Sequence, residues 1–324
     1  MRSIPWHGSA ESTHFRRIDP GGAHNEGMET AGARARAAEL DARIVPIDWF
    51  AADPHAVPIR FAAPSGTLAG WSLGDPAAAR VVLVPGATGS KEDFLLLAPP
   101  LVAAGYFVQT FDLAGQYDSA QAGPSAASGR YDYPLFTADL IAFLEQGEPA
   151  HVLGYSFAGI VAQLVLAERP ELLRSLTLLT TPPLTGNVFR RMKIVGFLAR
   201  FFSARVGAAL LVWGIRTNKN GVDEQRLEFV RRRLGVTRRA SVDDMVGLMM
   251  ATPDVTARVA SAGIPILVAT GKHDLWSVRA HAAYAARIGA ELAVYRTGHS
   301  PCETTPNQLA CDMIMTFERA EQPA

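Results

Sequence analysis

The stretch that decides the fold is His151-Val152-Leu153-Gly154-Tyr155-Ser156-Phe157-Ala158-Gly159. An apolar run ends at Gly154, Ser156 follows, and a helix-forming run over residues 160–166 comes directly after it. A serine between a strand and a helix, with small residues beside it, is typical of a sharp turn that presents a hydroxyl nucleophile. The small neighbours leave room for such a turn against the adjoining strand. Taken alone, the stretch also fits a strand that ends at Gly154 and a helix capped by Ser156.

The composition indicates a globular protein with no bias toward one class of partner. Of the 324 residues, 48% are hydrophobic, which is enough for a large core. The formal net charge is zero, so we expect no partner among nucleic acids and no general attraction to anionic membranes. No apolar run is long enough for a membrane span, and the N-terminus lacks the pattern of a signal peptide. Together with the small number of cysteines, these features favour a cytoplasmic protein.

Residues 1–40 form the first segment that we distinguish, and we expect them to be a poorly ordered extension. They show neither a helical nor a strand period. His7, His14 and His24 could suggest a metal site, but a solvated tail fits this composition better. We therefore expect neither a metal nor an organic cofactor.

From Ile44 onward the chain shows first an antiparallel meander and then a regular alternation of strands and helices. The expected meander strands are residues 44–49, 56–61 and 67–72. The expected later strands are residues 80–84, 106–111, 151–153, 176–180, 264–269 and 291–295, and the clearest helices are residues 132–146, 156–169 and about 307–317. Apolar strands that alternate with helices predict an α/β fold whose mostly parallel sheet is covered on both faces.

Residues 185–257 interrupt this alternation with a stretch that is helical in period and rich in arginine. We interpret it as a helical cap inserted between a first core part, residues 41–184, and a second core part, residues 258–324. We expect its arginines to form a solvated face. The alternatives are that they attract an anionic substrate or hold the cap at a membrane surface.

A base and an acid for Ser156 are expected on loops that follow parallel strands. Asp274 follows the strand over residues 264–269, and His299 follows the strand over residues 291–295. The order Ser156, Asp274, His299 is the order of a nucleophile-elbow hydrolase. Among the other histidines, His273 competes because it adjoins Asp274, whereas His281 lies on a predicted helix.

Backbone donors for a developing oxyanion are expected on both sides of the nucleophile. One is the N–H of Phe157, directly after Ser156. The other is the N–H of Ala87, which follows Pro85-Gly86 after the strand over residues 80–84. The dipeptide Pro85-Gly86 also fits a simple tight turn.

With these residues assembled, the chain resembles the α/β-hydrolase fold superfamily over residues 44–324, apart from the insertion. The resemblance implies an eight-stranded, mostly parallel sheet, a Ser-His-Asp triad and a helical cap. Two departures are Pro85-Gly86, where the family often has His-Gly, and Ala158, where the elbow usually has a second glycine. The motifs that carry the resemblance are Val84-Pro85-Gly86-Ala87-Thr88-Gly89-Ser90, Gly154-Tyr155-Ser156-Phe157-Ala158-Gly159, Gly271-Lys272-His273-Asp274 and Gly298-His299-Ser300-Pro301.

The expected function is that of a serine hydrolase that forms an acyl-enzyme on Ser156. The expected substrate is a small molecule, a medium-sized and largely apolar ester or thioester. Hydrolysis of a carbon–carbon bond, aminopeptidase activity and perhydrolysis use the same triad and stay open as alternatives. A binding protein that keeps the fold without turnover is the alternative outside the enzymes.

Overall fold

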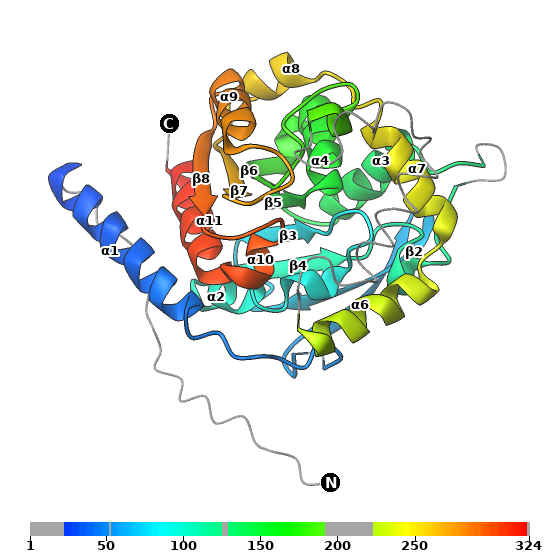
Figure 1. The fold of residues 1–324 in the computed structure, drawn as a ribbon, viewed down its shortest axis with the longest axis horizontal. Coiled ribbons are helices and arrows are strands. Elements are labelled where there is room, and N and C mark those ends of the chain that lie inside the picture. The colour runs from blue at the N-terminus through cyan, green and yellow to red at the C-terminus, as the bar shows by residue number, and fades with distance from the viewer. Residues whose placement is uncertain (1–22, 52, 125–128, 192–222, 323–324) are drawn as a thin grey trace, which may run out of the picture.

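The computed structural model describes residues 23–51, 53–124, 129–191 and 223–322 around one eight-stranded sheet (Figure 1). The strands follow the order β1-β2-β4-β3-β5-β6-β7-β8 across the sheet. The pairs β1–β2 and β2–β4 are antiparallel, and all later neighbours are parallel, which confirms the predicted mostly parallel sheet. The bounds are β1 (Val57–Ala63), β2 (Gly66–Leu73), β3 (Arg80–Val84), β4 (Phe107–Phe111), β5 (Ala150–Tyr155), β6 (Leu173–Leu179), β7 (Ile266–Gly271) and β8 (Glu291–Tyr295).

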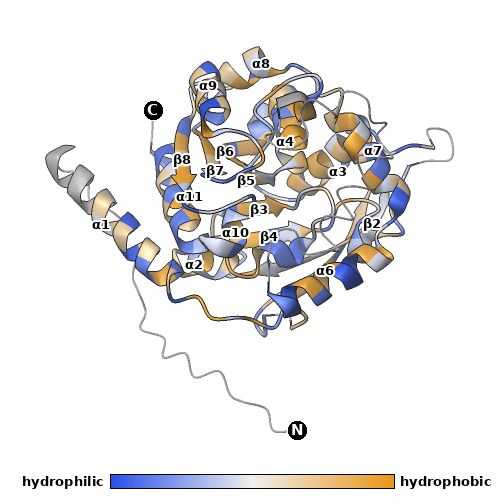
Figure 2. Ribbon diagram, in the orientation of Figure 1, coloured by the Kyte–Doolittle hydropathy of each residue, from blue (hydrophilic) through white to orange (hydrophobic). Residues whose placement is uncertain are grey.

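Helices cover both faces of the sheet because its central strands are apolar on both sides. Every residue of β3 and β5 is buried. Helices α3, α4 and α9 contribute to the core on one face, whereas α2 and α11 pack on the other, and their apolar residues turn toward the sheet (Figures 1 and 2). The bounds are α2 (Ala98–Ala103), α3 (Tyr133–Leu144), α4 (Phe157–Glu168), α9 (Val278–Ile288) and α11 (Pro306–Glu321).

Helix α9 has a capping residue at each end. Ser277 precedes it, and the Ser277 hydroxyl accepts a hydrogen bond from the N–H of Ala280 at 3.2 Å. Gly289 ends it in the left-handed conformation, with φ of 65°. These two caps set the residues at which α9 begins and ends.

The N-terminal region differs from the expectation at two places. Residues Ala23–Asp41 form helix α1, although the sequence pattern there predicted a poorly ordered extension up to residue 40. Contacts with α11 explain the helix, because the Asp41 carboxylate accepts hydrogen bonds from the backbone N–H groups of Asn307 and Gln308, at 2.8 and 3.1 Å. Such a contact with the far end of the chain leaves no local period in the sequence. Residues 1–22, which carry His7 and His14, lie outside the described residues.

The first predicted meander strand, residues 44–49, is also wrong, because residues 44–48 follow an irregular path. Pro46 cannot donate a ladder hydrogen bond, and Val45 is 69% exposed. Trp49 is buried, but it packs against Phe229 of a later helix instead of joining the sheet.

The chain between β6 and β7 carries the described part of the predicted cap. It holds the 3-10 turn η4 (Val188–Arg191) and the helices α6 (Glu224–Val236), α7 (Arg239–Met249) and α8 (Thr256–Ala260). Figure 1 shows α6 and α7 along one side of the sheet, near β2 and α3. Residues 192–222 lie outside the described residues, so the cap boundaries at 185 and 257 stay a prediction. In the part of the chain that the structure describes, no helix is both long and apolar enough to cross a membrane.

Candidate active site

Ser156 lies in the turn between β5 and α4, where the sequence places a nucleophile. Its backbone has φ of 52° and ψ of −114°, a conformation that is strained for a residue with a Cβ atom. Its N–H donates to the carbonyl oxygen of Leu179 at 2.8 Å, which anchors the turn to β6. Its side chain makes no capping hydrogen bond to α4. The reading of Ser156 as a simple helix cap therefore fails.

Glycines allow the strained turn because the backbone of α4 passes very close to its neighbours. A Cβ atom on Gly154 would lie 2.6 Å from the Cα atom of Gly159, and one on Gly159 would lie 1.8 Å from the Thr181 hydroxyl oxygen. Ala158, where the elbow motif usually has its second glycine, fits as a buried residue. In this chain the close approach therefore falls on Gly159, one position later.

His299 and Asp274 meet Ser156 at the carboxyl ends of the parallel strands. The Ser156 Oγ lies 3.2 Å from His299 Nε2, and His299 Nδ1 lies 2.5 Å from Asp274 Oδ1. Asp274 comes from the loop after β7 and His299 from the loop after β8. Because a carboxylate only accepts, His299 donates from Nδ1, and its Nε2 atom faces the serine hydroxyl. The structure thus brings all three predicted side chains into one hydrogen-bonded row.

The environment keeps Asp274 ionised although the side chain is fully buried. Burial alone disfavours the charged carboxylate. Hydrogen bonds from His281 and His299 outweigh burial and hold the pKa of Asp274 well below its usual range. The His299 side chain is 26% exposed, whereas that of Asp274 is fully buried. Solvent exposure therefore increases along the row from Asp274 to His299.

The loop that carries Ala87 lies directly against Ser156. A Cβ atom on Gly86 would lie 3.1 Å from the Cβ atom of Ser156 and 3.1 Å from the carbonyl oxygen of Tyr155. Phe157 is the first residue of α4, so its N–H belongs to the open first turn of the helix. Both residues predicted to supply oxyanion donors therefore flank the serine.

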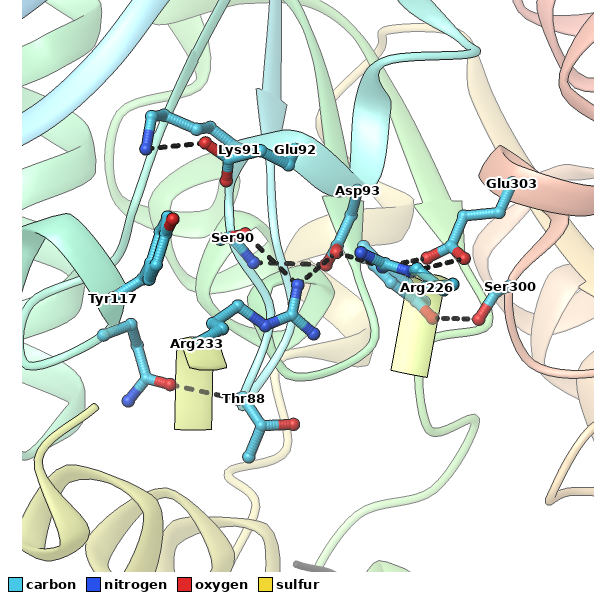
Figure 3. Close-up of polar contacts among 12 residues, drawn as sticks. Thr88, Ser90, Lys91, Glu92, Asp93, Tyr117, Arg226, Arg233, Ser300 and Glu303 are labelled. Atoms are coloured by element: carbon cyan, nitrogen blue, oxygen red, sulfur yellow. Dashed lines mark hydrogen bonds and ion pairs between the residues drawn. The ribbon is translucent and has the colours of Figure 1, made fainter. Parts of the chain in front are cut away.

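Side chains from neighbouring segments hold the Ala87 loop in place. The N–H of Thr88, whose φ is 63°, donates to Gln116 Oε1 at 3.1 Å (Figure 3). Gln116 Nε2 in turn donates to the hydroxyl of Ser241 on α7 at 2.7 Å. The N–H of Ser90 donates to Asp93 Oδ2 at 3.2 Å. One of these contacts reaches α7, which lies between β6 and β7.

A buried cluster of four charges joins α6 to the loops on both sides of the site (Figure 3). Asp93, in the 3-10 turn η1 (Lys91–Phe94), accepts from Arg226 Nη2 at 2.7 Å and from Arg233 Nη1 at 2.5 Å. Arg226 also pairs at 2.5 Å with Glu303, in the short helix α10 (Pro301–Thr304) after His299. Burial raises the pKa of Asp93, but Arg233 and Arg226 more than offset this and leave it lowered. The expectation that the cap arginines form a solvated face is thus wrong for Arg226 and Arg233.

Two further hydrogen bonds fix the segment around His299. The Ser300 hydroxyl lies 2.8 Å from the Tyr155 hydroxyl, so the residue after His299 contacts the residue before Ser156 (Figure 3). The Thr180 hydroxyl donates to the carbonyl oxygen of His299 at 3.0 Å. These contacts limit the freedom of the His299 loop relative to the serine.

The other histidines lie outside the row from Ser156 to Asp274, and one of them contacts its acid end. His273 is exposed and lies outside the row, and His151 is buried with its Nδ1 atom 2.8 Å from the Ser175 hydroxyl. His281, which the sequence placed on a helix and not in the role of the base, has its Nε2 atom 2.9 Å from Asp274 Oδ2. Sequence periodicity gives no signal for this contact, because the partner lies on the loop before the helix. Over the described ranges, no group of three or more His, Cys, Asp or Glu side chains suits a metal ion.

Comparisons with known proteins agree with this fold. One curated relative, rhodomycin D methylesterase of Streptomyces peucetius, is 35% identical over 118 residues, which cover 34% of this chain and 38% of that protein. A hydrolase from Pseudomonas aeruginosa PA01 superposes with a TM-score of 0.65 at 21% identity, over 81% of this chain and 98% of the other. An epoxide hydrolase from Vigna radiata superposes with a TM-score of 0.67 at 13% identity, over 83% and 100% of the two chains. The sequence model of the alpha/beta hydrolase family matches residues 81–312, and this chain therefore belongs to that family of hydrolases.

Proposed function

We propose that the protein is a serine hydrolase that works through an acyl-enzyme on Ser156. The observation that carries the proposal is the row from Ser156 Oγ through His299 to Asp274, with steps of 3.2 and 2.5 Å. A serine hydroxyl is a weak nucleophile until a base removes its proton, and an oriented imidazole is such a base. Asp274 supplies the orientation, because its carboxylate fixes the proton of His299 on Nδ1.

The proposed reaction has two halves that share one base. Ser156 Oγ attacks the carbonyl carbon of the substrate while His299 Nε2 takes the serine proton. The tetrahedral oxyanion is stabilised by the N–H groups of Ala87 and Phe157. As the intermediate collapses, His299 gives the proton to the leaving alcohol or thiol, and an acyl ester remains on Ser156. Water then attacks this ester with the same base, and release of a carboxylic acid restores the enzyme.

The proposed substrate is a medium-sized, largely apolar ester or thioester. Aromatic rings adjoin the base, with the Tyr155 and Trp276 ring centres 5.5 and 6.0 Å from that of His299. The curated relative is a methylesterase, which favours an ester among the two bonds. Carbon–carbon bond hydrolysis, aminopeptidase activity and perhydrolysis use the same three residues, so they remain the alternative reactions.

Covalent labelling tests the proposal. A fluorophosphonate should attach once to the folded protein, and Ser156→Ala should abolish the attachment without loss of fold. A folded wild-type protein that takes no label would instead support a binding protein that keeps the fold without turnover.

The substrate class is tested separately with a panel of short- and medium-chain p-nitrophenyl esters, methyl esters, acyl thioesters and peptides. We expect turnover of the apolar esters or thioesters. Turnover confined to polar peptides would end the ester proposal and favour the aminopeptidase alternative.

A further inference from the structure

Asp274 contacts a second histidine in addition to His299. His281 projects from α9 and is fully buried, and its Nε2 atom lies 2.9 Å from Asp274 Oδ2. His299 uses the other carboxylate oxygen, Oδ1. The two imidazoles therefore hold the carboxylate from opposite oxygens, one from a loop and one from a helix.

A buried histidine at this place costs free energy that an apolar residue would not. The Nδ1 atom of His281 is buried and has no hydrogen-bond partner among the described residues. An unsatisfied polar atom in the core destabilises a protein. The position faces the main apolar core, which includes Tyr284, Ala285 and Ile288 of the same helix. Burial of the His281 side chain therefore lowers the stability of the fold, and its Nε2 atom contacts Asp274.

The contact also defines the protonation of His281. A carboxylate only accepts hydrogen bonds, so the proton of His281 lies on Nε2. A second proton on Nδ1 would be a buried donor without an acceptor, which is the less favourable arrangement. His281 thus donates one hydrogen bond to Asp274 through its Nε2–H.

We propose that His281 is a positioning residue for the hydrolytic reaction. Its Nε2–H fixes Asp274 Oδ2, so that Oδ1 stays in line with His299 Nδ1, and it draws part of the carboxylate charge away from His299. This inference rests on the proposed function, because orientation of Asp274 matters only if His299 acts as a base.

Removal of the Nε2–H donor should therefore change both rate and pH dependence. A carboxylate that is free to rotate no longer holds His299 in one orientation, so kcat falls while KM stays nearly constant. The carboxylate also directs more of its charge toward His299 and favours the protonated imidazole. Protonated His299 cannot accept the serine proton, so the acid limb of the kcat/KM profile moves to higher pH.

The groups around Asp274 keep this pH readout simple. The titratable side chains that act on Asp274 are the two imidazoles, and the Thr270 hydroxyl lies 3.4 Å from Oδ2. Helix α9 packs against α8, β7 and β8, and its Tyr284 hydroxyl donates to Gln163 of α4. The titratable residues of these four elements are Arg258, Glu291 and Glu168, which are exposed, and Tyr295, which is bonded to Asp312.

The test compares three substitutions of His281 in the full-length enzyme. His281→Phe and His281→Leu remove the donor, whereas the amide N–H of His281→Gln can replace it. We expect the first two to lower kcat roughly 10- to 100-fold with KM within about twofold. The acid limb should move up by roughly 0.5 to 1 pH unit. His281→Gln should recover most of the rate and return the limb toward the wild-type position.

His151→Leu is the matched control. His151 is also fully buried, but it lies near the start of β5, at the end of the strand away from Ser156. This variant should leave kcat and the acid limb unchanged even if the protein melts at a lower temperature. A folded His281→Phe or His281→Leu enzyme with wild-type kcat and acid limb would overturn the role of His281. The proposed function would survive that result, because it depends on wild-type labelling and on the inactivity of Ser156→Ala.

A measurement on the wild-type enzyme covers the case in which these variants do not fold. Nitrogen-15 NMR of the histidine side chains reports which ring nitrogen is protonated. We expect the Nε2 atom of His281 to carry a proton at the pH of the activity assay. A proton on Nδ1 with none on Nε2 would overturn the proposed positioning role.

Discussion

Arg233 and Asp93 lie 140 residues apart in the chain, yet their side chains form a buried ion pair at 2.5 Å. Arg233 belongs to α6, in the segment between β6 and β7, and Asp93 follows the loop that carries Ala87. Arg233 also donates to the Ser90 hydroxyl at 3.1 Å. Helix α6 therefore helps to hold the segment that follows Ala87 in place.

The first prediction concerns this pair. Arg233→Met leaves Asp93 buried with one arginine fewer, so we expect the free energy of unfolding to fall by about 3 kcal/mol. We also expect kcat to fall, because the Ala87 loop loses its contact at Ser90. Urea unfolding and ester hydrolysis measure the two effects.

Arg232→Met is the control for Arg233→Met, since Arg232 lies next in the same helix but is exposed. Its free energy of unfolding should stay within about 0.5 kcal/mol of wild type. The double variant Arg233→Met/Asp93→Asn should lose less than the sum of the two single variants. Additive losses would mean that the pair does not act as a unit.

The second prediction concerns the shifted glycine of the elbow. A Cβ atom on Gly159 would lie 1.8 Å from the Thr181 hydroxyl oxygen, so Gly159→Ala should lower the free energy of unfolding by about 2 kcal/mol or more. It should also reduce kcat, because the start of α4 has to move. Gly235→Ala is the matched control: its Cβ atom meets no described atom within 4 Å, and it should stabilise α6 by about 0.5–1 kcal/mol. Equal effects at both positions would contradict the close packing at Gly159.

The third prediction concerns the proposed base and its partner. His299→Ala should lower kcat/KM for a p-nitrophenyl ester by several orders of magnitude. Asp274→Asn should cost about 10⁴-fold, because an amide no longer fixes the proton of His299 on Nδ1. Neither change should abolish folding as judged by circular dichroism. A His299→Ala enzyme with near-normal rates would remove His299 from the proposed mechanism.

The fourth prediction concerns stability and pH. Burial raises the pKa of Asp139 to about 6, although Ser65 donates to the Asp139 carboxylate from its N–H at 3.0 Å and from its hydroxyl at 2.6 Å. In the unfolded chain the pKa is about 3.9. The folded state thus binds this proton more tightly than the unfolded chain does. The stabilisation that protonated Asp139 gives to the folded state is therefore fully present below pH 4 and is lost as pH rises through 6.

Asp139→Asn tests this contribution, because the uncharged amide can accept from the Ser65 N–H through its oxygen and donate to the Ser65 hydroxyl through its nitrogen. Relative to wild type, the variant should gain up to about 3 kcal/mol of unfolding free energy between pH 4 and pH 8. Urea titrations at the two pH values measure the gain. A difference between the two proteins that does not change with pH would show that Asp139 titrates at its ordinary pKa.

Much of the fold and the row at the site could be predicted because each follows from local patterns. The alternation of apolar runs and helices predicts the parallel sheet, and loops after parallel strands converge at one edge. Ser156, Asp274 and His299 could be chosen from those loops, and the structure brings their side chains together. The family match confirms the expected fold class.

The remainder depends on contacts between distant residues, which leave no local pattern. Helix α1 rests on contacts of Asp41 with the start of α11, across 266 residues. Arg226 and Arg233 read as solvated cations until Asp93 and Glu303 are placed beside them. His281 lies only seven residues from Asp274, but the helical period assigns it to the core and says nothing of its partner. In each case a contact formed in the folded structure determines the role of the residue, and the local sequence pattern does not predict that contact.

The central claim is that Ser156 carries the acyl group during turnover. Rapid mixing of the enzyme with p-nitrophenyl acetate, followed by an acid quench and mass spectrometry of the digested protein, tests it most directly. We expect a burst of one equivalent of p-nitrophenol and one acetyl group on the peptide that contains Ser156, both absent in Ser156→Ala. Turnover without an acetylated Ser156 peptide, or with the same burst in Ser156→Ala, would contradict it.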